Sequence, residues 1–225
     1  MALLLNIDTA FETASVAVSR SGEVVAVERN HEQKGHASFL QPAIQRVCEC
    51  AGVALSAIDA VAVANGPGSY TGLRVGLASA KGICYALHKP LILINTLDIL
   101  ACALKEEAPH DSSTVLFCPL IDARRMEVYT ALYDIHLNLI KEPAAVVLTV
   151  DFLKEEKENY RILLAGNGSS KLRSFMQHDN IIYSTVEAEM RHFVRLAHHA
   201  YGLKKFADVA YSEPIYLKPV YIKQP

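Results

Sequence analysis

Two stretches of the chain repeat one pattern, and this repeat constrains the fold more than any other feature. The apolar run Leu3–Asp8 ends in an aspartate, and residues 13–28 that follow it alternate between apolar and polar around a Ser-Gly turn. Further along, the apolar run Val115–Asp122 also ends in an aspartate, and two more strand-like stretches follow within residues 127–150. Alternation of this kind is typical of strands. Each stretch is therefore expected to form a three-stranded meander.

The repeat extends to the residues themselves. Residues 6–10 read Asn-Ile-Asp-Thr-Ala, and residues 120–124 read Leu-Ile-Asp-Ala-Arg, so an aspartate ends the first strand of each meander. This echo predicts an α/β protein made of two duplicated ribonuclease-H-like halves. Asp8 and Asp122 are then expected to meet across a cleft.

The polar, turn-rich stretch Pro109–Thr114 is the best candidate for a linker between the halves. It divides the chain into an N-terminal domain of residues 1–108 and a reduced C-terminal domain of residues 109–225. Hydrophobic periodicity and turn residues place the other elements. Helices are expected at 37–51, 73–88, 96–107, near Phe152, after Gly168 and at 187–206, and further strands at 58–64, 91–95, 161–165 and near Ile181.

The stretch 65–81 (NGPGSYTGLRVGLASAK) looks like a phosphate-binding loop but matches neither common template. No lysine follows Gly72, as a P-loop requires, and Thr71 stands where a dinucleotide fingerprint has its third glycine. The loop leads from the expected strand 58–64 into the expected helix 73–88, whose free N–H groups can receive an anion. Turn chemistry alone explains the glycines equally well. Both interpretations stay open on these residues.

Composition narrows the function classes. The chain has 225 residues, 51% of them hydrophobic and 20% charged, with a net charge of -2. It has no polybasic footprint, which disfavours binding of nucleic acid or membrane by the chain alone. It also has no apolar run long enough for a membrane span and no signal-like start. Five cysteines without zinc spacing are expected to be reduced thiols of a cytoplasmic protein.

Four motifs in order resemble one family. They are Ile7–Ala10, Gly66–Gly76, Ile121–Arg124 with Glu127–Tyr129, and Glu213–Leu217. Over nearly its whole length the chain resembles the TsaB (YeaZ) family. The resemblance implies the two-domain fold of the actin/hexokinase/Hsp70 (ASKHA) type. It also implies a part in making N6-threonylcarbamoyladenosine in tRNA.

The same resemblance implies specific partners. TsaB-like proteins bind and support TsaD, a metal-bearing paralogue that transfers the threonylcarbamoyl group, and they act together with the ATPase TsaE. The chain is therefore expected to be a non-catalytic subunit of the transferase, with no activity alone, and a homodimer when isolated. It is expected to meet tRNA only through the complex. No tightly bound cofactor is expected, although ATP or ADP can sit at the partner interface.

No metal site or catalytic residue is expected. The resemblance implies that TsaD holds its metal with two histidines at H-x-x-x-H spacing and an aspartate. At the matching helix this chain has His36, and Leu40 stands at the position of the second histidine. A single helical imidazole does not make a three-ligand site.

Asp8, Asp122, Gly166 and Gly168 are the candidates for nucleotide binding. Carboxylates at strand ends can face Mg²⁺ and phosphates, and the loop Gly166-Asn167-Gly168 resembles the adenosine contact of this superfamily. Each aspartate can equally accept N–H bonds from its own turn, as in an Asx-turn. If they form a site, the chain is a self-sufficient ATP-dependent kinase instead. A peptidase is the last alternative, since neither a metal triad nor a nucleophile–base pair is evident.

The helix after the glycine loop is the expected partner interface. Gly72, Gly76 and Ala80 recur every four residues and form one stripe of small side chains. Two glycines inside a helix cost about 1 kcal/mol each, and close approach of another helix would offset this. Because a neighbouring leucine stripe accounts for packing on the chain's own sheet, the small stripe is expected to be free for a partner. The interface prediction comprises Gly72, Leu73, Gly76, Ala80, His36 and Leu40.

Overall fold

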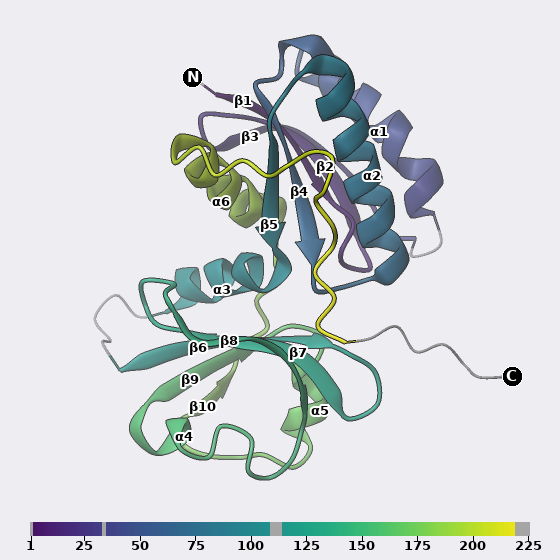
Figure 1. Cartoon of the computed structure of the whole chain (residues 1–225). Helices are drawn as coiled ribbons and strands as arrows, with labels where there is room; N and C mark the ends of the chain where they lie inside the picture. Colours follow the sequence, from purple (N-terminus) through teal and green to yellow (C-terminus); the bar gives the residue numbers. More distant parts are fainter. Residues whose placement is uncertain (1, 33–34, 109–113, 219–225) are drawn as a thin grey trace, which may run out of the picture. The chain divides into compact units, whose positions relative to one another are not determined.

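The computed structural model describes residues 2–32, 35–108 and 114–218 (Figure 1). These residues divide into two compact units. The first runs to Ile99 and includes Ala188–Pro214, and the second comprises Leu100–Glu187 and the described residues from Ile215 onward.

The first unit is built on a five-stranded sheet with the order β3-β2-β1-β4-β5. Its strands are β1 (Leu3–Asp8), β2 (Ala14–Arg20), β3 (Glu23–Asn30), β4 (Ala60–Gly66) and β5 (Leu91–Asn95). The first three form the expected antiparallel meander, and β4 and β5 run parallel to β1. The strands β1 and β4 are buried along their whole length, because helices cover both faces of the sheet.

Three helices cover this sheet, two on one face and one on the other (Figure 1). The first face carries α1 (His36–Cys50) and α2 (Tyr70–Leu87), with the short turn η1 (Leu55–Ala57) between α1 and β4. The opposite face carries α6 (Met190–Gly202), whose buried side chains pack with those of β1, β4 and β5. The helix α3 (Thr96–Glu107) follows directly after β5.

The second unit repeats the strand order of the first. Its sheet has the order β10-β9-β6-β7-β8. The strands are β6 (Val115–Asp122), β7 (Glu127–Tyr133), β8 (Leu139–Val147), β9 (Arg161–Ala165) and β10 (Ile181–Tyr183), with the short helices α4 (Glu156–Asn159) and α5 (Ser169–Arg173). Again the first three strands are antiparallel, and the last two run parallel to the first. The expected duplication of a ribonuclease-H-like half is confirmed.

The compact units are not the continuous segments 1–108 and 109–225 that the sequence suggested, because residues 188–214 pack with the first unit. The reason is α6, which carries an apolar face of Met190, Phe193, Val194 and Ala197, each at most 5% exposed. That face completes a core with the side chains of the first sheet. The expected linker 109–114 lies outside the described residues except for Thr114.

Two smaller elements differ from the sequence prediction. The strand expected at 144–150 is β8, which begins at Leu139 and ends at Val147. Its polar start, with Lys141 and Glu142, looks like a loop, but β8 is an edge strand that pairs only with β7, so exposed polar side chains fit there. The helix expected near Phe152 forms four residues later, as α4.

All five cysteines are free, as expected. Burial raises the pKa of Cys84 to about 11 and that of Cys118 to about 12, so both remain thiols at neutral pH. Among the described residues, none of the helices combines the length and the apolar composition needed to cross a bilayer.

Candidate nucleotide-binding and partner-binding residues

Asp8 and Asp122 occupy equivalent places at the ends of β1 and β6 and make equivalent turns. Asp8 Oδ1 accepts a hydrogen bond of 2.9 Å from the backbone N–H of Ala10. Asp122 Oδ1 accepts one of 2.5 Å from the N–H of Arg124. Each aspartate therefore closes the Asx-turn that the structural interpretation of these residues predicted.

The environment of Asp8 opposes its charge. The residue is only 8% exposed, and burial raises the pKa of its carboxyl to about 6, although the hydrogen bond from Ala10 works in the other direction. A carboxylate that coordinates Mg²⁺ has to be ionised, so this burial makes cation binding at Asp8 more costly. The observed geometry explains Asp8 as a turn residue.

Asp122 lies in a polar setting within the second unit. Its Oδ1 is 2.6 Å from Lys171 Nζ, and its backbone N–H donates to Asn167 Oδ1 at 2.8 Å. Partial burial works against ionisation of this carboxyl, but the hydrogen bonds from Lys171 and Arg124 outweigh it and hold its pKa below the usual value. The charge of Asp122 is thus already balanced by a lysine of the same unit.

The second unit brings three of the four nucleotide candidates together. Asp122 ends β6, and Gly166 and Gly168 flank Asn167, whose side chain contacts the backbone of Asp122. Asn167 and Lys171 complete this cluster, and the sequence analysis did not single them out. Their only sequence signal is their position in and just after the glycine loop. Asp8 belongs to the first unit.

The glycines of both loops allow close packing, in the first unit against the turn after β1 and in the second unit against β6. Gly66 and Gly166 have φ values of 111° and 106°, a conformation that favours glycine. A Cβ on Gly166 would lie 2.3 Å from the carbonyl oxygen of Leu120, and one on Gly68 would lie 2.5 Å from that of Ala10. The turn interpretation therefore accounts for these glycines. A nucleotide contact at Gly166 and Gly168 stays a prediction.

His36 is committed to the interior of its own unit. Its side chain is 6% exposed, and Nε2 donates to the carbonyl oxygen of Phe11 at 3.1 Å. Leu40, one turn further along α1, is fully buried. Within residues 2–32, 35–108 and 114–218, the structure places no group of three or more His, Cys, Asp or Glu side chains where they could hold a metal ion.

The small-residue stripe of α2 is not free, and this corrects the sequence analysis. A Cβ on Gly72 would lie 2.0 Å from the carbonyl oxygen of Thr9, and one on Gly76 would lie 2.3 Å from Thr9 Oγ1. Leu73 and Ala80 are also buried. The two glycines leave room for the turn that follows β1, so the close approach comes from the backbone and side chain of Thr9 in this same chain.

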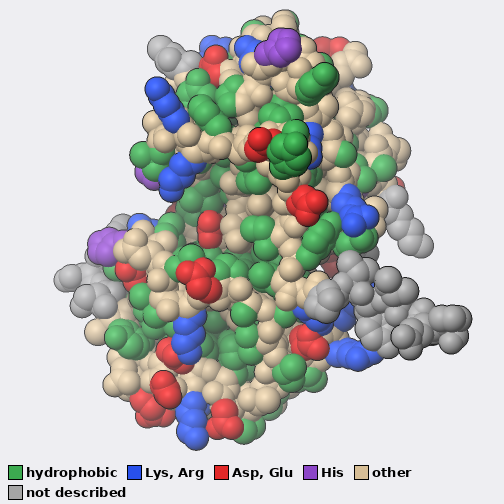
Figure 2. Space-filling model, in the orientation of Figure 1, with side chains coloured by type: hydrophobic (Ala, Val, Ile, Leu, Met, Phe, Trp, Pro, Cys, Tyr) green, Lys and Arg blue, Asp and Glu red, His purple; other side chains and the backbone are tan. Residues whose placement is uncertain are grey.

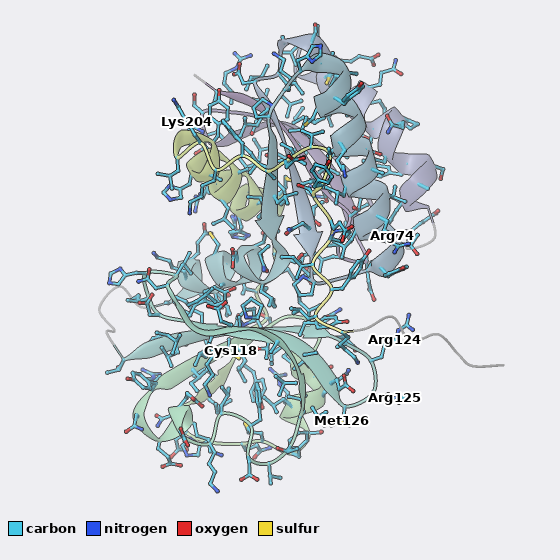
Figure 3. The ribbon with its side chains drawn as sticks, in the orientation of Figure 1. Arg74, Cys118, Arg124, Arg125, Met126 and Lys204 are labelled. Atoms are coloured by element: carbon cyan, nitrogen blue, oxygen red, sulfur yellow. The ribbon has the colours of Figure 1, made fainter. Side chains whose placement is uncertain are left out.

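A different stripe of α2 faces solvent. Ala78, Gly82 and Ala86 are exposed at the same four-residue spacing, and Tyr85 beside them is 80% exposed. At the N-terminal end of this face, the guanidinium of Arg74 lies 4.1 Å from the centre of the Tyr70 ring (Figure 3). The spacing of both stripes is readable from the sequence, but only the position of the sheet shows which one is covered.

The outer face of α1 adjoins that stripe. Gln41 donates a hydrogen bond of 3.1 Å to Ser79 Oγ on α2. Gln41 and Gln45 are both exposed, one turn apart. The described surface of the two helices is therefore polar and small on its outer side, whereas His36 and Leu40 point into the core.

The fold and the paired turns define a class of protein. Two ribonuclease-H-like sheets, each with an aspartate at the end of its first strand, are the architecture of the ASKHA type. The structure of an inorganic polyphosphate/ATP-glucomannokinase from Arthrobacter sp. strain KM supports this fold. It has a TM-score of 0.51 at 13% identity over 91% of this chain and 100% of that one.

Closer similarities identify the family. The model of the TsaD family, described as tRNA N6-adenosine threonylcarbamoyltransferase, matches residues 24–214. The tRNA threonylcarbamoyladenosine biosynthesis protein TsaB of Bacillus subtilis is 32% identical over 170 residues, which are 74% of this chain and 72% of that protein. The structure of YeaZ from Pseudomonas aeruginosa has a TM-score of 0.80 at 27% identity and covers 96% of this chain and 100% of that one. The chain belongs to the TsaB (YeaZ) family.

Proposed function

We propose that this chain is a non-catalytic subunit of the machinery that makes N6-threonylcarbamoyladenosine in tRNA, where it binds and supports the transferase paralogue TsaD. Relatives that carry the name TsaB and the match to the TsaD family model support a role in this modification. The support for a non-catalytic role comes from one position, the start of α1.

At that position the chain has a packed histidine in place of a ligand pair. His36 Nε2 donates a hydrogen bond to the carbonyl oxygen of Phe11, and Leu40, one turn further along the helix, is buried in the core. A metal that activates a transfer reaction usually needs three protein ligands and an open position. A subunit that only binds a partner needs no metal ligands here, and a rigid, well-packed helix is sufficient for that role.

The outer faces of α1 and α2 are the surface that we assign to TsaD. Their side chains are small or polar, and Ala78, Gly82 and Ala86 leave room for the backbone of a partner helix to come close. Tyr85, which is 80% exposed, supplies an aromatic side chain of the kind that is enriched at interfaces. The same faces would serve a homodimer of the isolated chain.

The remaining parts of the proposal follow from the family. The complex would include the ATPase TsaE and act in the cytoplasm. Any ATP or ADP would sit at the interface with TsaD, and tRNA would be bound by the assembly. The chain's own strand-end acids give little support to an independent kinase, because Asp8 is buried and Asp122 is paired with Lys171.

Reconstitution with one component left out tests the function. TsaD, TsaE, the threonylcarbamoyl-adenylate and tRNA are combined with and without this chain, and modified nucleoside is measured over time. We expect the rate to fall at least tenfold when the chain is absent and to return when it is added. The variant His36→Ala should restore the rate as well as the native chain does, provided that it folds. An unchanged rate without the chain would overturn the proposal.

A further inference from the structure

Positive charge is concentrated in one segment of a chain that is nearly neutral. Residues 190–207 contain four Lys or Arg and three His but no Asp or Glu, whereas the whole chain has 24 acidic residues and a net charge of -2. This segment is α6 together with the turn that follows it. A net charge near zero therefore hides a local basic surface.

The geometry of α6 directs this charge outward. Its apolar side chains are buried against the first sheet, and Arg191, Arg195 and His199 are exposed on the opposite side. At a rise of 1.5 Å per residue, their four-residue spacing sets them about 6 Å apart along one line. Lys204 and Lys205 are exposed just beyond the end of the helix (Figure 3). Figure 2 shows blue side chains on the flank of the first unit where α6 lies.

Acidic groups flank the two ends of this surface. Glu189 precedes the helix and its Oε1 is 3.3 Å from the guanidinium of Arg191. Asp208 follows the lysines, and its Oδ1 accepts hydrogen bonds from the N–H groups of Ala210 and Tyr211. Arg195 lies between these two ends and is exposed.

Exposed apolar side chains accompany the lysines. Leu203 is 54% exposed, Phe206 is 43% exposed and Tyr211 is 84% exposed. Phe206 packs against Tyr201, with ring centres 5.8 Å apart and ring planes tilted by 59°. Basic side chains beside accessible aromatic rings are the combination that binds a nucleic-acid backbone and stacks unpaired bases.

We propose that this surface, Arg191–Tyr211, binds the phosphodiester backbone of RNA. The proposal rests on the proposed function and adds to it the face of this chain that would contact RNA within the assembly. A membrane surface suits the geometry less well, because an interfacial helix inserts its apolar face and the apolar face of α6 is already occupied by the sheet. With few cationic groups, binding is expected to be weak for the chain alone and to add to the affinity of the complex.

Salt dependence of RNA binding by the complex with TsaD is the test. The triple variant Arg195→Gln, Lys204→Gln, Lys205→Gln is compared with the native chain by anisotropy of a labelled tRNA at several salt concentrations. We expect the variant complex to bind about tenfold more weakly at low salt. The slope of log affinity against log salt should become smaller in magnitude by about 2 to 3, since each lost phosphate contact removes roughly 0.7 to 0.9.

A matched control removes the same charge elsewhere. The variant Lys105→Gln, Lys154→Gln, Arg161→Gln changes three exposed cations of the second unit. It should keep the native affinity and slope. If both triple variants lose affinity equally, the effect is one of net charge and the proposal is wrong.

The outcomes separate this proposal from the function on which it rests. If the α6 variant binds TsaD and RNA like the native chain, the proposal fails while the partner role stands. If the native chain does not bind TsaD or is not needed for modification, the partner role fails first. Binding of the native chain to anionic vesicles that the α6 variant loses, with RNA binding unchanged, would assign the surface to a membrane instead.

Discussion

The hydroxyl of Thr9 donates a hydrogen bond of 2.7 Å to the carbonyl oxygen of Gly72, and this contact joins the turn after β1 to the first turn of α2. The two residues are 63 positions apart in the chain. Gly72 and Gly76 lack side chains because Thr9 takes up the space that a side chain would need. The glycines of α2 thus fix the helix to its own sheet.

Gly76→Ala should destabilise the first unit. A Cβ at this position would lie 2.3 Å from Thr9 Oγ1, and overpacking of this kind costs about 1 to 3 kcal/mol. That cost exceeds the gain of about 1 kcal/mol expected from the better helix propensity of alanine. Thermal and urea unfolding of the variant measure the difference.

Two companion variants make this prediction specific. Thr9→Ala removes the oxygen that the new methyl group would meet, so Gly76→Ala should cost less in the Thr9→Ala background than in the native one. Gly82→Ala lies in the same helix, where its new Cβ would meet nothing within 4 Å beyond the neighbouring backbone of α2, and it should stabilise by about 1 kcal/mol. Equal destabilisation by Gly76→Ala in both backgrounds would contradict the role given to Thr9.

Asp8 should make stability fall as pH rises. Its pKa is about 6 in the folded state against 3.8 ordinarily, so the folded protein holds a proton that the unfolded chain releases. The contribution of Asp8 to the free energy of unfolding therefore falls between pH 4 and pH 6 and is constant above that range. At about 1.4 kcal/mol per pKa unit, the loss is roughly 3 kcal/mol.

Asp8→Asn removes that titration while keeping an oxygen for the N–H of Ala10. The variant should unfold at higher urea concentration than the native protein at pH 7.5 and at a similar one at pH 4. Asp122→Asn is the contrasting case, because Lys171 lowers the pKa of Asp122. Its native carboxylate stabilises the fold above its ordinary pKa and loses this effect as pH falls. If both variants shift with pH in the same direction, the assignment for Asp8 is wrong.

Ala78→Arg should weaken binding to TsaD and self-association by at least tenfold without lowering the melting temperature. The residue is exposed at the start of the outer stripe and halfway along α2, where a long side chain would hold a partner helix away. Ala57→Arg, at an exposed site in η1, is the control and should bind normally. Sedimentation and titration with TsaD measure both. Normal assembly of Ala78→Arg would move the interface elsewhere.

The isolated chain should not bind Mg-ATP with micromolar affinity. Both strand-end acids have other roles, since Asp8 closes a buried turn and Asp122 pairs with Lys171. Isothermal titration of the purified chain is the measurement, with the complex with TsaD as a comparison. Micromolar binding by the chain alone would support the kinase alternative, and Lys171→Met would then show whether Asp122 takes part.

Patterns along the sequence were enough to predict the duplicated architecture. The apolar runs that end in Asp8 and Asp122 are local signals, and each marks the first strand of a meander whose later strands alternate. The turn role of the two aspartates was also foreseeable, because an Asx-turn involves only neighbours two residues apart. Local periodicity and local hydrogen bonding carried these predictions.

The predictions that were wrong depended on contacts between segments that are far apart in the sequence. Gly76 is small because of Thr9, and nothing in the spacing of α2 shows which of its faces the sheet covers. The cluster around Asp122 depends on Asn167 and Lys171, which lie more than forty positions away. The place of α6 in the first unit has the same origin, since its apolar face fits either sheet as far as the pattern tells.

The return of α6 to the first sheet has a consequence for how the protein is made. Synthesis on the ribosome proceeds from the N-terminus, and domains generally fold as units once they have emerged. Here one face of the first sheet, with Leu4, Ala17 and Ile92, is left without its cover until residues 190–197 leave the exit tunnel. By then all the strands of the second unit have been translated. The nascent chain therefore covers this face of its N-terminal sheet only after the second sheet has been translated, and a ribosome that stalls before residue 190 leaves that apolar face open to chaperones and to aggregation.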